Sequence, residues 1–275
     1  MSGLEQLSGK VAVVTGGASG IGKGIARRFI EQGMRVVVAD IEREALERTA
    51  AELGAVAVVT DVSSRESVQA LADEVLRRFG SVDVVCNNAG VGSVANIADM
   101  KTADWTWLIN VNLWGVIHGV EVFLPILSRN AGGGHIVNTA SVGGMSTLPT
   151  LGGYCATKFA VVGLSETLAQ ELALAGSKVG VTILCPGPVR TNIKTSTRNR
   201  PPSFAHGGLV DSDLEKSEVG QGIRWLEPDA VGDIVVRAIR RGDLYAFTHP
   251  EMKGNIVERH RRIEAAFDEA AAGQP

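Results

Sequence analysis

Tyr154 and Lys158 are the residues of this sequence best suited to move a proton. They stand four positions apart in the run YCATK, a spacing that places two side chains on one face of a helix, one turn apart. A phenol, with a pKa of about 10, is a poor base at neutral pH. An ammonium about 4 Å away favours the phenolate by about 4 kcal/mol at an effective dielectric of about 20, which is about three pKa units. The pair therefore predicts a tyrosine general acid/base that works near neutral pH, although ordinary surface pairs share this spacing.

A hydroxyl group at Ser141 would complete this chemistry. It follows an apolar run in the segment NTASVGG, so it is expected in the turn after a strand. There it could donate a hydrogen bond to a carbonyl oxygen and stabilise the negative charge that develops on that atom. The alternative is a serine that caps or stabilises the turn.

A glycine-rich run, TGGASGIG over residues 15–22, follows the first predicted strand and opens the first predicted helix. Gly16, Gly20 and Gly22 carry no Cβ, so the backbone can turn tightly and approach a pyrophosphate. The N-terminus of the helix adds unpaired N–H groups and the positive end of its dipole. The spacing G-x-x-x-G-x-G differs from the common G-x-G-x-x-G, and a purely structural turn is the alternative.

Asp40 ends the second predicted strand, about 20 residues after the glycine-rich run, where an acid accepts hydrogen bonds from an adenosine ribose. Its charge would repel a 2′-phosphate by about 4 kcal/mol at about 4 Å and an effective dielectric of about 20. Neither Arg nor Lys lies within the glycine-rich run. These features predict that the cofactor is NAD rather than NADP. The alternative is that Asp40 has a structural role and caps the helix over residues 42–53.

Two further polar segments follow predicted strands. Asp61 follows the third strand and could hold the adenine amino group, and the run NNAG at residues 87–90 follows the fourth. Because ligands of open α/β sheets bind at the carboxyl ends of the strands, both segments are expected beside the cofactor.

The elements that must position these residues alternate between strand and helix. Apolar β-branched runs predict strands that are buried on both faces, at Val11–Thr15, Val36–Asp40, Val56–Thr60, Val82–Cys86, His135–Thr139, Val179–Cys185 and Leu244–Phe247. Helical patterns lie between them, at Ile21–Gln32, Glu42–Leu53, Ser64–Phe79, Ala103–Arg129 (with a bend expected at Pro125), Ala156–Ala175 and Asp229–Arg241. The alternation predicts a single α/β domain over residues 1–275, with a Rossmann-type, doubly wound, parallel, seven-stranded sheet and helices on both faces.

Two segments depart from this alternation. Residues 191–228 form a long connection with several prolines and glycines, which predicts a substrate lid; this segment is called the lid below. Residues 250–272 read as a charged C-terminal helix. Its arginines, Arg259, Arg261 and Arg262, are expected on a solvated face or in a subunit contact.

The composition excludes several classes of protein. The 275 residues are 45% hydrophobic and 21% charged, which supports a sizeable core, and a net charge of −3 gives no electrostatic footprint for nucleic acid. No apolar run of about 18 residues predicts a membrane helix, and the N-terminus does not resemble a signal peptide, so a cytoplasmic protein is expected. Cys86, Cys155 and Cys185 fit neither a disulfide framework nor a zinc pattern, and are expected as buried thiols.

Taken together, these motifs resemble the classical short-chain dehydrogenase/reductase family from Lys10 to about Thr248. The resemblance depends on the ordered set TGGASGIG, Asp61-Val62, NNAG, Asn112 in NVNLWG, Ser141, YCATK and Pro186-Gly187 in CPGPVRT. It implies an NAD-dependent alcohol dehydrogenase or ketone reductase that transfers a hydride to or from the nicotinamide. It also implies a homo-oligomer, either a tetramer or a dimer, that pairs the helices around residues 104–129 and 154–174.

The resemblance further implies roles for individual residues. Tyr154 would be the catalytic acid/base, Ser141 would polarise the substrate oxygen, and Lys158 would bind the nicotinamide ribose and lower the pKa of the tyrosine. Asn112 would hold a water molecule in a proton relay from Lys158. Val189 and Thr191 would contact the nicotinamide carboxamide, and no metal site is implied. The complete set of implied cofactor-binding residues is Gly16, Ser19, Gly20, Ile21, Gly22, Asp40, Asp61, Val62, Asn88, Ala89, Gly90, Tyr154, Lys158, Pro186, Gly187, Val189 and Thr191.

The substrate pocket is expected between residues 142–151 and the lid. Both segments are largely apolar, through Met145, Leu148, Phe204, Leu209 and Trp225, which predicts a hydrophobic secondary alcohol or its ketone as the small-molecule substrate. The segments TSTRNRP and LYAFTHPEM resemble those of bacterial family members that act on bulky aryl alcohols. The basic residues of the lid, which could instead meet an acidic group, are Lys194, Arg198 and Arg200. The tryptophans, which are expected to pack between helices, are Trp105, Trp107 and Trp114.

Three alternatives to this function remain at the level of sequence. The first is a nucleotide-binding regulator that keeps the fold but catalyses no reaction. The second is a family member that acts on a hydroxyacyl thioester, a steroid or a sugar. The third, a sugar epimerase or dehydratase of the extended relatives, would need a longer C-terminal domain than this sequence provides.

Overall fold

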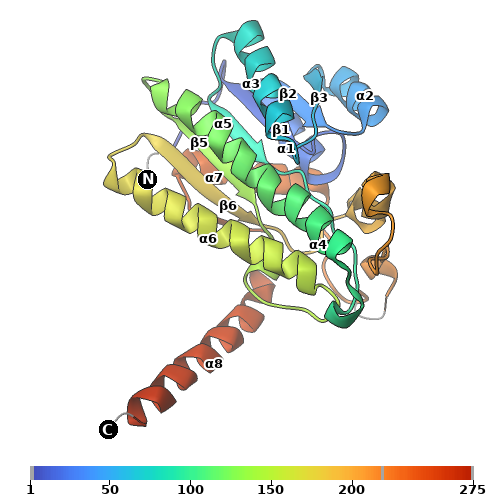
Figure 1. The fold of residues 1–275 in the computed structure, drawn as a ribbon. Helices are drawn as coiled ribbons and strands as arrows, with labels where there is room; N and C mark the ends of the chain where they lie inside the picture. Colours follow the sequence, from blue (N-terminus) through green and yellow to red (C-terminus); the bar gives the residue numbers. More distant parts are fainter. Residues whose placement is uncertain (1–2, 218–219, 274–275) are drawn as a thin grey trace.

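The computed structural model describes residues 3–217 and 220–273, in which seven parallel strands form one sheet (Figure 1). The strands are β1 (Val11–Thr15), β2 (Arg35–Asp40), β3 (Val56–Val59), β4 (Val84–Asn87), β5 (Gly134–Thr139), β6 (Val179–Cys185) and β7 (Tyr245–Phe247). They follow the order β3-β2-β1-β4-β5-β6-β7, and every neighbouring pair is parallel. The predicted doubly wound α/β fold with a single domain is confirmed.

Helices cover both faces of the sheet (Figure 1). One face packs against α1 (Gly20–Glu31), α2 (Arg43–Leu53) and α7 (Pro228–Arg241), and the other against α3 (Arg65–Phe79), α5 (Gly115–Arg129) and α6 (Gly152–Leu174). Successive residues of a strand point into opposite cores: Ala12 and Val14 face α1, whereas Val11 and Val13 face α3. This double burial is the physical reason why the strands are continuous apolar runs in the sequence.

The start of α6 differs from the sequence-based boundary in a way that matters for the site. The helix begins at Gly152 rather than at Ala156, so Tyr154 and Lys158 both lie within its first two turns. Gly152 and Gly153 allow this end of the helix to approach Ile97 and Met100 closely, since a Cβ on either glycine would lie 2.6 Å from one of those side chains. Both residues of the YCATK pair are therefore held by one rigid element.

The single helix predicted over residues 103–129 is wrong in one respect, because the structure divides this stretch. It contains α4 (Thr102–Ile109), a π-helical turn at Asn110–Trp114, and then α5. Pro125 lies inside α5, which continues beyond it to Arg129, so the irregularity is at the π turn and not at the proline. A π turn accommodates one extra residue in a helix and often lies at a functional site.

By length and mean hydropathy, the combined stretch Thr102–Arg129 could cross a membrane, a property that the sequence analysis did not detect. Several of its large apolar side chains instead lie in the protein core. Trp107 and Leu108 pack beneath the lid, while Phe123 and Leu127 pack against the sheet. Core helices of folded proteins satisfy the same test of length and hydropathy, and the burial of these four residues fits that explanation.

The lid and the C-terminal helix lie at opposite sides of the carboxyl end of the sheet (Figure 1). Isolated bridges join the lid to the main fold, one between Val210 and Val94 and the other between Leu226 and Val189. The lid begins with a 3-10 helical stretch, Asn192–Asn199, and its residues 218 and 219 lie outside the described residues. The predicted C-terminal helix is a short 3-10 turn, Pro250–Met252, followed by α8 (Lys253–Ala272).

Candidate active site

The sequence motifs converge where β1 lies between β2 and β4. This is the point at which the strand order reverses, and open α/β sheets bind ligands there, outside the carboxyl ends of the strands. The glycine-rich run follows β1, Asp40 ends β2, and the NNAG run begins at the end of β4. Strand register therefore brings together residues that are far apart along the chain.

The glycine-rich turn leaves no room for side chains on its inner side. Gly16 has φ +65, a left-handed conformation that favours glycine, and a Cβ there would lie 2.8 Å from the Cα of Ala89. A Cβ on Gly22 would overlap the carbonyl oxygen of Gly16. Ser19 caps α1 in an extended conformation, makes no side-chain cap bond, and no acidic residue occupies the first turn. The exposed helix N-terminus and the bare backbone fit a dinucleotide pyrophosphate.

Thr15 holds the NNAG run against the glycine-rich turn through hydrogen bonds. The backbone N–H groups of Asn88 and Ala89 donate to Thr15 Oγ1 at 2.9 and 3.1 Å. The amide of Asn88 also donates to the carbonyl oxygen of Thr15 at 2.9 Å. These bonds hold the two loops that flank the predicted pyrophosphate and nicotinamide positions in one rigid unit.

Asp40 faces the glycine-rich turn rather than capping α2. Its carboxylate accepts hydrogen bonds from the backbone N–H groups of Ala18 and Glu42, both at 3.1 Å, and the capping position of α2 is occupied by Glu42. Burial raises the pKa of Asp40, while these backbone donors act in the opposite direction. The carboxylate therefore stands at the place expected for an adenosine ribose, fixed by two donors.

Asp61 and Val62 lie in the loop after β3. Asp61 Oδ1 accepts hydrogen bonds from the backbone N–H and the hydroxyl of Ser63, at 2.9 and 2.7 Å, and these bonds order the loop. Val62 is buried against Gly115, where a Cβ would lie 2.8 Å from a methyl group of Val62. The loop is thus packed onto the start of α5.

Tyr154, Lys158 and Ser141 come together at the ends of β5 and α6. Lys158 is buried, its ammonium donates to the carbonyl oxygen of Thr139 at 2.8 Å, and it lies 5.6 Å from the centre of the Tyr154 ring. Ser141 is buried, its hydroxyl donates to the carbonyl oxygen of Pro186 at 3.4 Å, and it stands near enough to Tyr154 to lower the pKa of the phenol. Ser141 Oγ also accepts from the backbone N–H of Gly143 at 3.0 Å and caps a short 3-10 turn, so the alternative role as a cap is present as well.

Burial changes the proton affinities of this pair in a way that the spacing argument did not anticipate. Burial raises the pKa of Tyr154 to about 12, and the nearby hydroxyl of Ser141 only partly offsets that effect. Burial also lowers the pKa of Lys158 to about 8. A buried site disfavours both charged forms, so burial opposes the effect that the lysine was predicted to have on the phenol, and a tyrosine that works near neutral pH stays a prediction.

Asn112 lies in the π turn, fully buried beside this site. Its side chain accepts from the backbone N–H of Val91 at 2.8 Å and donates to the carbonyl oxygen of Val91 at 2.9 Å. A Cβ on Gly90 would lie 3.2 Å from Asn112 Oδ1 and 3.6 Å from Lys158 Nζ, so the two side chains flank this glycine. The sequence analysis placed Asn112 near Lys158, and the structure does the same.

The loop after β6 carries the remaining predicted contacts. The backbone N–H of Gly187 donates to Thr248 Oγ1 at 2.9 Å, and a Cβ on Gly187 would lie 2.5 Å from a ring atom of His249. Pro186 accepts a hydrogen bond from the backbone N–H of Val142 at 3.0 Å. Val189 is buried, and this anchors the start of the lid to the main fold.

The first part of the lid lies across the site. Thr191 packs against Gly20, whose Cβ would lie 3.0 Å from the threonine side chain. A Cβ on Gly92 would lie 3.1 Å from Ile193 and 3.5 Å from the Tyr154 ring, so Ile193 borders the tyrosine. The lid thus contacts both the pyrophosphate turn and the surroundings of the proposed acid/base.

The basic residues of the lid all have protein partners, which corrects the suggestion that they could meet an acidic substrate. Lys194 pairs with Asp213 at 2.9 Å, Arg198 with Glu42 at 2.6 Å, and Arg200 with Asp104 at 2.6 Å. Since each charge is already neutralised within the chain, an acidic group on the substrate would have to displace a carboxylate. Within the described part of the lid, these three residues therefore serve contacts inside the protein.

Sequence reasoning missed the buried pair of Asp104 and Arg200. Asp104 is fully buried and accepts hydrogen bonds from the backbone N–H groups of Lys101 and Gly208, both at 2.8 Å. The guanidinium of Arg200 lies 5.4 Å above the centre of the Trp107 ring. Asp104 and Arg200 come from α4 and the lid, and nothing in their local sequence indicates that they meet.

Two of the three tryptophans pack as expected. Trp105 and Trp107 join a cluster with Leu209 and Phe204 of the lid. Trp114, in contrast, is 46% exposed and stacks on His118, so the expectation of helix packing is wrong for this residue. The cluster shows that some apolar residues of the lid pack against α4 and hold the lid there.

One family model, described as short chain dehydrogenase, matches residues 10–202 of the chain. Among solved structures, the chain is similar to a short chain dehydrogenase/reductase from Burkholderia phymatum in complex with NAD. The two are 39% identical with a TM-score of 0.87, and the match covers 96% of this chain and 97% of the other. LigO from Sphingobium sp. strain SYK-6 is 32% identical with a TM-score of 0.82, over 99% of this chain and 93% of LigO.

Curated relatives extend this similarity. A C alpha-dehydrogenase from Sphingobium sp. (strain NBRC 103272 / SYK-6) is 33% identical, over 98% of this chain and 88% of its own length. A CLA biosynthesis dehydrogenase/reductase from Lactiplantibacillus plantarum is 29% identical, over 94% of this chain and 95% of its own length. These matches span the lid as well as the sheet.

Proposed function

The chain belongs to the short-chain dehydrogenase family, and from that premise we propose that it is an NAD-dependent oxidoreductase that interconverts a hydrophobic secondary alcohol and its ketone. The membership and the dehydrogenase names of the relatives support an oxidoreductase with a nicotinamide cofactor. The observation that carries the proposal is the meeting of Tyr154, Lys158 and Ser141 beside the end of the NNAG run, which is itself hydrogen bonded to the start of the glycine-rich turn. Aryl alcohols are included in the proposed substrate class.

The residues that would hold the cofactor line the carboxyl edge of the sheet. The backbone of the glycine-rich turn and the N-terminus of α1 would bind the pyrophosphate. Asp40 would accept from the adenosine ribose, and Asp61 and Val62 would border the adenine. Asn88, Ala89 and Gly90, with Pro186, Gly187, Val189 and Thr191, would enclose the nicotinamide end. When bound, the cofactor supplies the hydride acceptor for oxidation or the hydride donor for reduction.

The proton steps belong to the chain's own residues. During oxidation, Tyr154 would take the proton of the substrate hydroxyl while the carbinol carbon loses its hydride; reduction runs in reverse. Ser141 would donate a hydrogen bond to the same substrate oxygen and stabilise negative charge on it. Lys158 would hold the nicotinamide ribose and add positive charge near the phenol, and Asn112 would order a water molecule between Lys158 and solvent. A positive nicotinamide ring would lower the pKa of Tyr154 further.

NAD is proposed over NADP because of the charges around Asp40. A 2′-phosphate would approach the Asp40 carboxylate directly. The nearby cations that could compensate are already paired, Lys23 with Glu52 at 2.6 Å and Arg198 with Glu42 at 2.6 Å. The NAD complex of the Burkholderia phymatum relative supports the same preference.

A hydrophobic substrate is proposed because the segment between Ser141 and Tyr154 and the lid present apolar side chains. Leu148 is 43% exposed in this segment, and Ile193 borders Tyr154 from the lid. The relative named C alpha-dehydrogenase and the similarity to LigO favour aryl alcohols within the class. The pairing of every lid cation noted above argues against an acidic substrate.

The proposal is tested by titrating the protein with NADH and then measuring oxidation of a panel of aliphatic and aryl secondary alcohols, steroids, sugars and hydroxyacyl thioesters with NAD. We expect turnover with hydrophobic alcohols, and loss of most of it in Tyr154→Phe while NADH affinity is retained. NADH binding without turnover of any alcohol would indicate a silent regulator. Unchanged turnover in Tyr154→Phe would show that another group is the base.

A further inference from the structure

The C-terminal helix α8 extends away from the body of the protein (Figure 1). Its contact with the fold is confined to its first turns, where the guanidinium of Arg259 lies 4.9 Å above the ring of Phe159 on α6. Every residue from 261 to 272 is exposed; we call this stretch the arm. At about 1.5 Å of rise per residue, the arm reaches about 18 Å into its surroundings.

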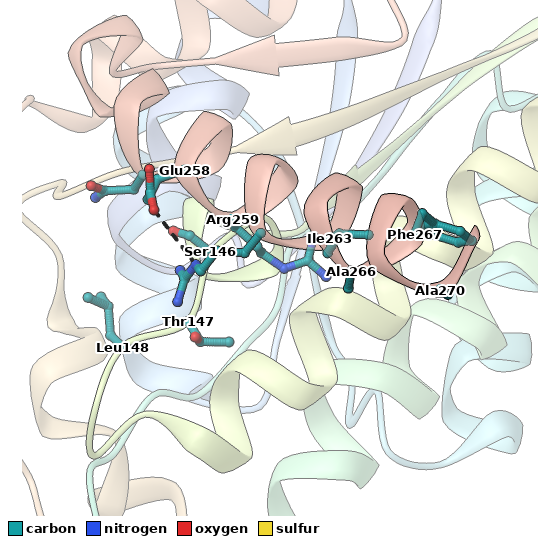
Figure 2. A pocket seen from close by; sticks show the side chains of 11 residues that line it. Ser146, Thr147, Leu148, Glu258, Arg259, Ile263, Ala266, Phe267 and Ala270 are labelled. Atoms are coloured by element: carbon teal, nitrogen blue, oxygen red, sulfur yellow. Dashed lines mark ion pairs between the residues drawn. The ribbon is translucent and has the colours of Figure 1, made fainter. Parts of the chain in front are cut away.

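One face of α8 is apolar, and its outer part, beyond the partly buried Ile256, is left exposed by the described chain. Ile256, Ile263, Phe267 and Ala270 are spaced by seven, four and three positions, which aligns them along one side of the helix. Ile263 is 41% and Phe267 is 74% exposed. Ile263, Phe267 and Ala270 line a groove of about 830 Å³ together with the loop at residues 146–148 and the polar side chains of Asn255, Glu258, Arg259 and Arg262 (Figure 2).

An arm of this length is not stable as a helix by itself. Isolated helices shorter than about 12–15 residues are marginal in water, and their stability in proteins comes from packing of the apolar face. The charges of α8 lower the stability of the isolated helix further, because its basic residues lie toward the N-terminal end and its acidic residues toward the C-terminal end. That arrangement opposes the helix dipole, which favours the reverse.

The same arrangement of charge indicates what covers the arm. Residues 253–262 carry Lys253, Arg259, Arg261 and Arg262 against the single acid Glu258. Residues 263–272 carry Glu264, Asp268 and Glu269 and no basic residue. Two such helices laid antiparallel place the basic half of one beside the acidic half of the other. A helix that lies on an anionic membrane needs a basic polar face along its whole length, which the arm lacks.

We propose that α8 is a pairing helix for a second copy of this chain, which binds antiparallel through a twofold axis near residue 265. In this arrangement Ile263 of one copy packs on Phe267 of the other and the reverse, as an isologous contact requires. The second copy's helix fills the groove, and the basic half of each helix lies beside the acidic half of the other. The contact also covers Ser146–Leu148, the loop between Ser141 and α6. The pairing thus borders the proposed substrate pocket, of which Leu148 is a part, but its test does not depend on the proposed reaction because the readout is the mass of the assembly.

The first test measures the solution mass of the full chain by light scattering after gel filtration. Phe267→Asp places a carboxylate on the apolar face, and Ala265→Asp places the same group on the opposite face as a matched control. We expect the variant on the apolar face to form an assembly of half the wild-type mass, with the control unchanged. A monomeric wild type, an unchanged mass of Phe267→Asp, or equal losses in both variants would overturn the proposal.

The second test distinguishes antiparallel pairing from other occupants. Arg262→Glu and Glu269→Arg should each weaken the assembly at low salt, and the double variant should restore it, which neither parallel pairing nor an unrelated partner would do. Ala266→Cys should form a disulfide-linked dimer on oxidation much faster than Ala265→Cys, since the described native cysteines are all buried. Failure of the double variant to recover the assembly would refute the antiparallel arrangement. Co-sedimentation with phosphatidylserine vesicles that depends on Phe267, with no change in mass, would assign the arm to a membrane instead.

Discussion

The guanidinium of Arg198 and the carboxylate of Glu42 lie 2.6 Å apart, and this ion pair joins the lid to the loop that follows β2. Asn199 donates a second hydrogen bond to the same carboxylate at 2.9 Å. The two paired residues are 156 positions apart in the chain. Because Glu42 stands two positions after Asp40, the pair holds the lid over the adenosine end of the proposed cofactor site.

Breaking this contact should loosen cofactor binding while the chemical step is retained. Partly exposed ion pairs contribute up to about 1 kcal/mol, so Arg198→Ala should raise the Kd for NADH by up to about fivefold, with kcat changed less. Stopped-flow fluorescence of NADH release provides the measurement, and raising the salt concentration should reduce the difference. Arg43→Ala, which removes an exposed arginine of α2 paired with Glu47, is the control. An equal effect in the control would contradict a specific role for the lid contact.

The buried charge of Lys158 should set the pH dependence of oxidation. Burial raises the pKa of Tyr154 to about 12, so the phenolate needed for oxidation forms at lower pH only while positive charge stands near it. Lys158→Met removes that charge, and the rising limb of the kcat/KM profile should move to higher pH. Lys158→Arg should restore part of the shift. If kcat/KM falls in Lys158→Met at every pH and the rising limb does not shift along the pH axis, Lys158 acts through cofactor binding alone.

Asp40 should decide between the two nicotinamide cofactors. The wild type is expected to prefer NAD, and Asp40→Ala should change the ratio of kcat/KM for NAD to that for NADP by about tenfold or more toward NADP, because the repulsion of the 2′-phosphate is removed. The variant also loses the acceptor for the N–H groups of Ala18 and Glu42, so activity with NAD should fall as well. Steady-state kinetics with both cofactors give the ratio. A preference of the wild type for NADP would refute the argument.

The pair of Asp104 and Arg200 should stabilise the fold far more than a surface pair. Asp104→Asn leaves the buried Arg200 guanidinium without a counter-charge, and breaking such a pair costs about 3–5 kcal/mol. Urea unfolding should show a loss in this range, whereas Asp99→Asn, on the exposed surface of the same region, should change stability by less than about 0.5 kcal/mol. A loss below about 1 kcal/mol for Asp104→Asn would mean that water reaches the pair.

The sequence predicted the central strands well because these segments are buried on both faces, whereas the edge strands β3 and β7 are partly exposed, against the expectation of double burial. Val11–Thr15 and Val179–Cys185 agree with the structure at both ends, since an uninterrupted β-branched run has one obvious fold in an α/β protein. The residues of the YCATK pair, Ser141 and Asn112 were found because each stands in a local motif. Their proximity in the structure agrees with that reading.

The sequence could not predict features that depend on distant partners or on burial. The partners of Arg198 and Arg200 lie in other elements, so the lid cations resembled a substrate subsite when they were considered alone. The pKa of Tyr154 depends on how much solvent reaches the phenol, which spacing does not reveal. The π turn at Asn110–Trp114 was also missed, because the apolar pattern on either side of it is helical.

That turn couples chain length to the anchoring of the lid. A helix rotates by about 100° per residue, and a π turn absorbs one residue more than an α-helical path would need. Deleting a single residue between 110 and 114 would let α4 and α5 merge into one regular helix. Because the π turn already absorbs the extra residue, this deletion would leave Asp104 facing Arg200, whereas the deletion of a second residue would rotate Asp104 by about a quarter of a revolution away from it. The loss of one residue here should therefore be tolerated by the lid, and longer deletions should need compensating changes in residues 199–209.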